Sequence, residues 1–361
     1  MTLLRETVCA APRVTVVTPA YNAAHCLSRA VQSVLAQSER DFEYIIVDDG
    51  SEDDTPAIIS ELARSDNRIR TIFMPRNGGP SIARNAATDA ARGRWIAVLD
   101  ADDWYEPTRL QGLLDAAEGA DVQMVADNQV IFDAKAERRV GLAFPKCRDA
   151  RRIGLADFMA ATDPTASFDI GMLKPIFRTD FIRNHRVTYR EDVRHGEDYF
   201  VLLDFFVAGG RGLVVPDALY WYVQPFGTIS RQWAHDGGRR YPFEHVKRVN
   251  DDVVADMSSK LSPEHLKSLI KRGHALEALA CLHQVREQLR AANLRHAGRI
   301  VTNAPTGFWR LCARRAGGHL TRTLGRATYS FPRWRQVYER GLLRSHGSRL
   351  IGTCGVWQKP K

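Results

Sequence analysis

The chain has 361 residues, of which 44% are hydrophobic and 26% charged, as is usual for a soluble globular protein. No apolar run reaches about 18 residues, which argues against a transmembrane helix, and the first residues, MTLLRETVCAAPR, lack the apolar stretch of a secretory signal. The six cysteines form no C-x-x-C pair and no metal-finger spacing, as expected for reduced thiols in a cytoplasmic protein. The length predicts one main domain plus an appendage.

The net charge of +9 is unevenly distributed along the chain. From residue 290 to residue 361, 15 Lys and Arg stand against one acidic residue, whereas the first 289 residues carry 36 basic and 41 acidic side chains. In this basic tail, arginines alternate with leucines and aromatic residues, a pattern that suits the headgroup region of an anionic membrane. Binding to nucleic-acid phosphates, or packing as a helical appendage on the main domain, is compatible with the same pattern.

Apolar strands alternate with helical segments along the first hundred residues. We predict strands at residues 14–18, 42–47, 69–74 and 95–99, with a helix after each of the first three. This alternation predicts a parallel sheet with helices on both faces, in which ligands bind beyond the carboxyl ends of the strands. The later predicted elements are a strand at 122–126, a short helix at 179–184, a β-pair at 213–223 and a long helix that begins at Ser262.

A polar cluster follows each of the first four strands. In chain order the clusters are Tyr21 and Asn22, then Asp48 and Asp49, then a Gly-rich loop at 76–80, and finally Asp100, Asp102 and Asp103. Since parallel strands end at one edge of a sheet, a single crevice can collect all four clusters. No G-x-G-x-x-G follows the first strand and no G-x-x-x-x-G-K-[ST] occurs, which argues against ordinary NAD and P-loop sites.

Three aspartates at the end of an apolar strand need a physical reason. Carboxylates that share a site repel one another, so such a cluster favours a bound cation. Hard divalent cations such as Mg²⁺ and Mn²⁺ bind carboxylate oxygens and keep positions open for substrate phosphates. The alternative is a turn that caps a helix beginning near Pro107.

Four sequence blocks point to a family. VTVVTPAYN, SVLAQSERDFEYIIVDDGSEDDT, RNGGPSIARNAA and IAVLDADDWYEP occur in that order between residues 14 and 110. This segment closely resembles the nucleotide-binding half of family 2 glycosyltransferases, and within the family it looks most like succinoglycan-type glucosyltransferases. The resemblance implies a GT-A fold, which is Rossmann-like with a mostly parallel sheet and helices on both faces, followed here by a helical, basic C-terminal appendage.

The resemblance implies a binding site for a UDP-sugar. Tyr21 would stack on the uracil, and Asp49 would accept a hydrogen bond from its polar edge. The segment from Asn77 to Pro80 opens a helix whose backbone N–H groups are expected to line the nucleotide site. The other donor-binding positions implied are Pro19, Asn22, Gly50, Ser51, Gly78, Arg84, Asp100, Ala101 and Asp102.

Asp100 and Asp102 match the outer positions of the family's D-x-D motif. We expect Asp102 to contact Mn²⁺ or Mg²⁺ directly and Asp100 to reach the ribose or a metal-bound water, so that both belong to the metal site. The metal would neutralise charge that develops on the UDP leaving group. Arg84 and Asn85 are expected to brace the aspartates by hydrogen bonds, although for Arg84 a purely structural ion pair is equally compatible. Asp103 receives only a supporting role.

Glu197 and Asp198 open a predicted helix, where acids are stabilised by the helix dipole without any catalytic duty. In the family this E-D pair carries the catalytic base, a role that the resemblance assigns to Asp198. It would remove a proton from the acceptor hydroxyl in a single displacement that inverts the anomeric carbon. The segment 224–233 resembles the family's lid loop, with Ser230 and Arg231 closing over the diphosphate.

The resulting hypothesis is an inverting, metal-dependent transfer of a hexose, glucose being the favoured sugar, from a UDP-sugar to a saccharide hydroxyl. We expect a polyprenyl-diphosphate-linked acceptor in bacterial exopolysaccharide or cell-surface glycan synthesis, and an enzyme at the inner face of the cytoplasmic membrane. The catalytic domain would span 1–235, with donor-binding and acceptor-binding halves at 12–125 and 126–235. A helical C-terminal region with the basic tail would span 236–361.

Two other functions are compatible with parts of the sequence. A sugar nucleotidyltransferase also binds nucleotides in an α/β crevice, but it needs a cationic Gly-rich loop after the first strand, and PAYNAAHC offers no cation. A nucleic-acid-binding protein would use the arginine-rich tail but would leave the acids at the strand ends unexplained, so no nucleic-acid partner is expected.

Overall fold

The computed structural model describes residues 11–166, 168–224 and 242–314. The chain divides into two compact units, residues 1–308 and 309–361. All helices and strands described below belong to the first unit. The expected boundary between residues 235 and 236 lies outside the described residues, as do Ser230, Arg231 and the basic tail beyond residue 314.

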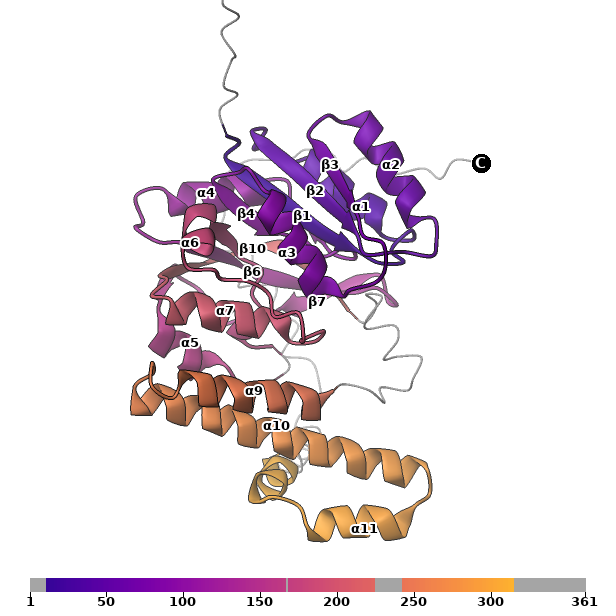
Figure 1. The fold of residues 1–361 in the computed structure, drawn as a ribbon, viewed down its shortest axis with the longest axis vertical. Helices are drawn as coiled ribbons and strands as arrows, with labels where there is room; N and C mark the ends of the chain where they lie inside the picture. Colours follow the sequence, from indigo (N-terminus) through magenta and orange to yellow (C-terminus); the bar gives the residue numbers. More distant parts are fainter. Residues whose placement is uncertain (1–10, 167, 225–241, 315–361) are drawn as a thin grey trace, which may run out of the picture. The chain divides into compact units, whose positions relative to one another are not determined.

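One ten-stranded sheet forms the centre of the described part of the chain (Figure 1). The strand order is β3-β2-β1-β4-β9-β6-β10-β5, with β7 paired to β6 and β8 paired to β10. Strand β9 runs antiparallel between β4 and β6, whereas β1 to β4, β6 and β10 share one direction. The strands are β1 (Val14–Ala20), β2 (Phe42–Asp48), β3 (Ile69–Phe73), β4 (Trp95–Val98), β5 (Trp104–Tyr105), β6 (Met124–Asp133), β7 (Arg138–Leu142), β8 (Arg151–Ile153), β9 (Ile176–Arg178) and β10 (Gly212–Gln224).

Helices cover both faces of this sheet, so that the central strands are buried on both sides. On one face, α1 (Leu27–Leu35), α2 (Thr55–Ser65) and α4 (Arg109–Ala117) share a hydrophobic core with Val14 and Val16 of β1. On the other face lie α3 (Pro80–Ala90), α5 (Leu155–Ala161), α6 (Thr179–Asn184) and α7 (Glu197–Val207), which share a core with Val17. A short 3-10 helix, η1 (Ile170–Met172), precedes β9. The predicted α/β architecture is confirmed.

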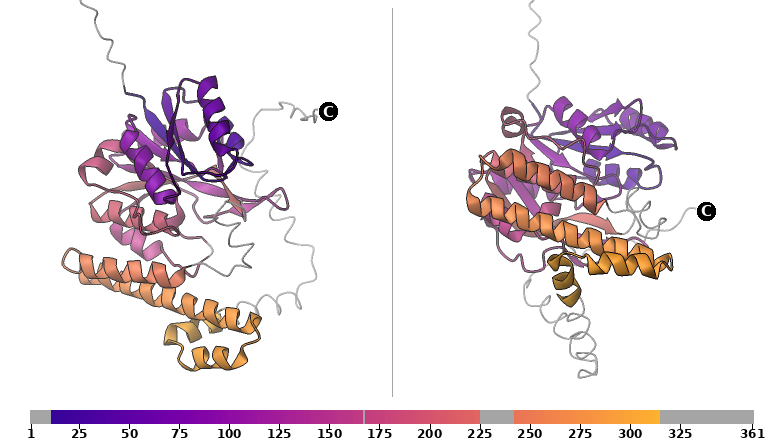
Figure 2. Two further views of the ribbon diagram at one scale, coloured as in Figure 1. Left: turned by 45° about the vertical axis from the view of Figure 1, so that its right-hand side comes forward. Right: turned by 60° about the horizontal axis from the view of Figure 1, so that its bottom comes forward.

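Three helices follow the sheet in the sequence: α9 (Phe243–Met257), α10 (Pro263–Arg290) and α11 (Leu294–Thr302). Ser262 caps α10 by accepting a hydrogen bond from the backbone N–H of His265, which confirms the predicted start of the long helix. Apolar residues of α9 and α10, among them Val249 and Leu276, join the hydrophobic core of α5 and α7. Accordingly, α5 and α7 lie between the sheet and the α9–α10 pair (Figures 1 and 2).

The prediction for residues 213–223 was wrong in its topology. This segment is not a β-pair but part of the single strand β10, which runs parallel to β6. The register shifts between Val214 and Tyr220, around Pro216, because proline has no N–H to donate to a neighbouring strand. The predicted strand at 122–126 begins at Met124 and extends further, to Asp133.

A fully buried ion pair fastens α4 to β6. The Arg109 guanidinium donates to the Asp127 carboxylate, with Nη2 and Oδ1 2.7 Å apart, and it lies over the ring of Tyr105. Loss of one partner would leave the other charge buried without compensation.

We therefore expect Arg109→Met to lower the free energy of unfolding by about 3–5 kcal/mol, measured by urea denaturation. The double variant Arg109→Met/Asp127→Leu, which removes both charges, should recover most of this loss. A single variant as stable as the wild type would contradict a structural role for the pair.

Candidate functional site

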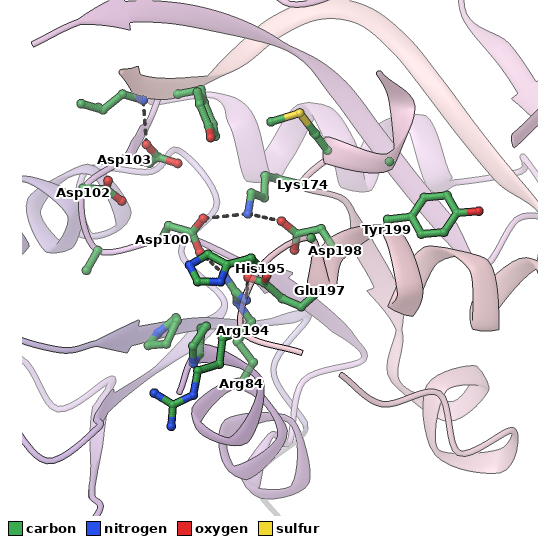
Figure 3. A pocket seen from close by; sticks show the side chains of 18 of the residues that line it. Arg84, Asp100, Asp102, Asp103, Lys174, Arg194, His195, Glu197, Asp198 and Tyr199 are labelled. Carbon is green, nitrogen blue, oxygen red and sulfur yellow. Dashed lines mark hydrogen bonds and ion pairs between the residues drawn. The ribbon is translucent and has the colours of Figure 1, made fainter. Parts of the chain in front are cut away.

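A cavity of about 680 Å³ opens at the carboxyl ends of β1, β2 and β4. Its wall is completed by the loop and 3-10 helix before β9 and by the first turn of α7 (Figure 3). The predicted site residues that line it are Pro19, Tyr21, Asp49, Asn77, Arg84, Asp100, Ala101, Asp102 and Asp198. The fold thus brings together residues from four predicted clusters and from a helix about a hundred residues further along.

Four predicted site residues shape the loops behind the cavity wall. The backbone N–H of Asn22 donates to Ser51 Oγ, and Asn22 Oδ1 accepts from the N–H of Glu52, which ties the loop after β1 to the loop after β2. Gly50 has a φ of +70°, and a Cβ there would lie 2.6 Å from the carbonyl carbon of Arg76, so only glycine fits. Gly78 contacts Asp49, as described next.

Asp49 binds the backbone of the Gly-rich loop. Its Oδ1 accepts from the N–H of Gly78 and its Oδ2 from the N–H of Gly79, both at 2.8 Å. Burial raises the pKa of Asp49, and these two hydrogen bonds act in the opposite direction. The expectation that backbone N–H groups of this loop line the nucleotide site is therefore corrected for these two residues, because their amides are directed to Asp49.

Five side chains of alternating charge form a continuous chain of ion pairs beside the cavity. Arg84 of α3 donates to Glu197 at 2.7 Å and to Asp100 at 2.6 Å. Lys174, two residues before β9, donates to Asp100 and to Asp198, both at 2.7 Å (Figure 3). The chain connects α3, the end of β4, the start of β9 and the first turn of α7.

The protonation of this ion-pair chain follows from its geometry. Burial would raise the pKa of Asp100, but Lys174 and Arg84 lower it well below its ordinary value. Burial opposes a charge on Lys174, yet Asp100 and Asp198 raise its pKa well above its ordinary value. The carboxylate of Asp100 and the ammonium of Lys174 are both charged at neutral pH.

Asp102 has an environment opposite to that of Asp100. Within the described ranges its carboxylate has no ion pair, and burial together with the charge of Asp100 raises its pKa to about 6. Asp102 is therefore a hard oxygen donor whose carboxylate has no ion pair among these residues, although the Arg29 guanidinium donates to its backbone carbonyl. Both oxygens of Asp100, in contrast, already accept from cations. These donors fit Mg²⁺ or Mn²⁺ at Asp102 and fit Asp100 less well as a direct ligand.

In the part of the chain that the structure describes, no group of three or more His, Cys, Asp or Glu is arranged to hold a metal ion. A cation at Asp102 would therefore take most of its ligands from substrate phosphates and water, as Mg²⁺ commonly does.

Asp103 and Asn85, two further polar residues near this site, form hydrogen bonds with different parts of the chain. Asp103 is buried and accepts from the hydroxyl of Tyr220 at 2.6 Å and from the N–H of Val223 at 2.8 Å, so it joins β10 to the end of β4. Asn85 does not brace the aspartates as predicted. Its side chain pairs with the backbone N–H and carbonyl of Tyr189, because it projects from a different side of α3 than Arg84.

Several cavity residues were missed from the sequence, among them Arg194 and His195. Lys174 lies in the segment expected beneath an acceptor. The sequence feature that could have identified it is its position as the single charged residue in the otherwise apolar run GMLKPIF. Phe243, Arg272 and Leu276, from α9 and α10, also line the cavity, although no site was expected in these helices. The Arg272 guanidinium lies 3.4 Å from the centre of the Tyr199 ring. Nothing in the helical pattern distinguishes Arg272 from a surface arginine.

Residues 15–183 match the family model described as "Glycosyl transferase family 2". This segment is a glycosyltransferase family 2 domain. The described part of the chain contains no helix with the length and apolar character needed to cross a membrane.

Bacterial proteins named for succinoglycan biosynthesis resemble the family 2 domain and its flanking residues. The succinoglycan biosynthesis protein ExoO of Rhizobium meliloti (strain 1021) is 39% identical over 226 residues, which are 61% of this chain and 63% of that protein. The succinoglycan biosynthesis protein ExoU of the same strain is 33% identical over 221 residues, 60% of this chain and 64% of that protein. The alignments thus span less than two thirds of the length of either relative.

Solved structures share the fold of the family 2 domain at low sequence identity. S. aureus TarS 1–349 in complex with UDP-GlcNAc has a TM-score of 0.55 and 18% identity, and the match covers 80% of this chain and 90% of that one. The mannosyltransferase PcManGT from Pyrobaculum calidifontis, in complex with GDP-Man and Mn²⁺, has a TM-score of 0.53 and 18% identity, with 93% and 81% covered. These likenesses confirm the predicted GT-A fold.

The raised pKa of Asp102 predicts a pH-dependent cost to stability. Protonated Asp102 contributes stability that is fully present below the ordinary carboxyl pKa of about 3.9 and is lost as the pH rises through about 6. Without metal, we expect Asp102→Asn to melt at a higher temperature than the wild type at pH 8, with a smaller difference at pH 5. Thermal denaturation in EDTA measures this, with Asp252→Asn, at an exposed position of α9, as control. A difference that does not grow with pH would contradict the assignment.

Proposed function

We propose that this protein is a metal-dependent, inverting glycosyltransferase that moves a hexosyl unit from a UDP-sugar to a hydroxyl of a saccharide acceptor. The observation that carries this proposal is the shared cavity, which is lined by Asp49 and Asp102 on the side of the strand ends and by Asp198 on the side of α7. The names of the similar proteins support a role in polysaccharide synthesis, and glucose is the sugar that we favour.

We assign the nucleotide to the strand-end side of the cavity. Tyr21 lines this side and offers an aromatic face for stacking on uracil. Asp49 already accepts two backbone N–H groups, and its remaining lone pairs can accept the imide N–H of the base. The UDP-GlcNAc in one solved neighbour supports a uridine nucleotide. The GDP-Man in the other makes a guanosine nucleotide the alternative that the donor test must include.

Asp102 is the proposed direct ligand of Mn²⁺ or Mg²⁺, and Asp100 contributes through its fixed charge or through a metal-bound water. When bound, the cation would neutralise negative charge on the departing diphosphate. Arg84 and Lys174 keep Asp100 ionised and oriented, so this carboxylate needs no metal for charge compensation.

Asp198 is the proposed catalytic base. Its Oδ2 accepts from Lys174, and Oδ1 has no hydrogen-bond partner among the described residues, so that atom is available to the acceptor hydroxyl. As the acceptor oxygen attacks C1 of the sugar, its proton passes to Asp198, and the bond from C1 to the UDP oxygen breaks. A single displacement of this kind inverts the anomeric carbon. Glu197 is less suitable because it is buried and its carboxylate already accepts from Arg84.

The acceptor side is proposed to comprise residues 126–235, opposite the donor-binding half at 12–125. Ser230 and Arg231, which lie outside the described residues, remain our candidates for the lid. We further propose a lipid-linked acceptor and peripheral binding at the inner face of the cytoplasmic membrane. The exposed residues of α11 include Leu294, Arg295 and Arg299, a combination of apolar and basic side chains that supports contact with an anionic surface.

The reaction class can be tested by UDP or GDP release. We expect slow release from one UDP-sugar in a panel that also contains GDP-mannose, with Mn²⁺ or Mg²⁺ present and water as the acceptor. EDTA and Asp102→Ala should each abolish this release, whereas Asp252→Ala, on the exposed face of α9, should not. If no donor is cleaved and calorimetry detects no binding of UDP, the proposed function is wrong.

The base can be tested separately. We expect Asp198→Asn to lower the rate of release by at least about 10²-fold, since general-base catalysis contributes about 10²–10⁴-fold. The affinity for UDP should stay close to that of the wild type, because Asp198 is hydrogen-bonded to Lys174 and not to Asp49 or Asp102. Equal losses of UDP binding and turnover would remove Asp198 from this role.

A further inference from the structure

We propose that Lys174 is a positioning residue for the catalytic base, which it holds by one oxygen so that the other faces the acceptor. This inference rests on the proposed function of Asp198. Lys174 itself need not touch the reacting atoms, since it would act through the carboxylate that it binds.

Lys174 is held at both of its ends. Its Nζ donates to Asp100 Oδ2 and to Asp198 Oδ2, each at 2.7 Å, and only 4% of its side chain is exposed. Its carbonyl oxygen accepts from the Arg109 guanidinium, which is itself paired with Asp127. The following residue, Pro175, restricts the backbone of Lys174 to extended conformations. The ammonium is therefore fixed relative to the sheet and not carried by a mobile side chain.

This placement fixes the orientation of Asp198. A carboxylate in the first turn of a helix can rotate about its side-chain bonds, which would exchange its two oxygens. The charge-assisted hydrogen bond from Lys174 selects Oδ2 as the bound oxygen. The Oδ1 atom is then the one available for the proton of the acceptor, and reacting groups must be aligned closely for efficient transfer.

The two carboxylates that share Lys174 do not depend on it equally. Asp100 has a second cation, Arg84, at 2.6 Å, whereas Lys174 is the one cation paired with Asp198 among the described residues. Loss of the ammonium would leave Asp100 compensated and Asp198 without an ion pair. We therefore expect its loss to impair the chemical step much more than donor binding.

The experiment uses the full chain and the UDP-sugar that the wild type cleaves. In Lys174→Met, we expect the turnover number for UDP release at saturating donor to fall by about 10²-fold, the usual cost of a misplaced group. The dissociation constant for UDP with Mn²⁺, measured by calorimetry, should change by less than about threefold. Lys174→Arg, which keeps the charge, should recover part of the turnover. Lys247→Met, which breaks a pair with Asp251 outside the cavity, is the matched control and should behave as the wild type.

The outcomes separate the possible roles of Lys174. A parallel loss of UDP affinity and turnover would overturn the proposal and place Lys174 at the donor diphosphate. Unchanged turnover in Lys174→Met would overturn it as well. If Lys174→Met does not fold, Lys174→Arg still decides, because a positioning role predicts reduced turnover with unchanged UDP affinity. If the wild type cleaves a donor and Asp198→Asn does not, the proposed function stands whatever the result for Lys174.

Discussion

The site depends on one electrostatic constraint, the chain of ion pairs from Glu197 through Arg84, Asp100 and Lys174 to Asp198. Arg84, Lys174 and Glu197 are buried, whereas 21% of the Asp100 side chain and 19% of the Asp198 side chain are exposed. Removal of one partner from a buried pair commonly costs about 3–5 kcal/mol. The carboxylates therefore stay close together only while the helices and strands that carry the two cations are in place. The same contacts that join α3, β4, β9 and α7 also fix the positions of the site residues relative to one another.

The ion pairs compensate the charge of Asp100 but not that of Asp102. Asp100 has two cations and a pKa well below its ordinary value, whereas Asp102, two residues later, has no ion pair in the described ranges and a pKa raised to about 6. The turn after β4 directs the two side chains into different surroundings, and Asp103 is anchored to β10. We propose that this difference makes Asp102 the site for a cation that neutralises a bound nucleoside diphosphate.

The cavity extends beyond the segment that defines the family. Residues 15–183 contain the strand ends and Lys174, but Asp198 comes from α7, and Phe243 and Arg272 come from the helices after the sheet. Packing of α9 and α10 on α5 and α7 builds this far wall. Since we propose that the strand ends bind the nucleotide, we further propose that this far wall contacts the acceptor.

The sequence by itself determined the alternation of strands and helices and the acids at the strand ends, because apolar periodicity and turn residues act over short distances. It did not determine the partners of those acids. Lys174 lies 74 residues from Asp100. A single lysine in an apolar run can pair with any carboxylate that the fold brings close to it, so the sequence does not indicate which one. Nor did it show that Asn85 hydrogen-bonds to the backbone of Tyr189 or that Arg272 lines the cavity. A helical pattern does not indicate which surface a side chain contacts. Only the tertiary structure decided these contacts, because burial and long-range pairing set which charges are compensated.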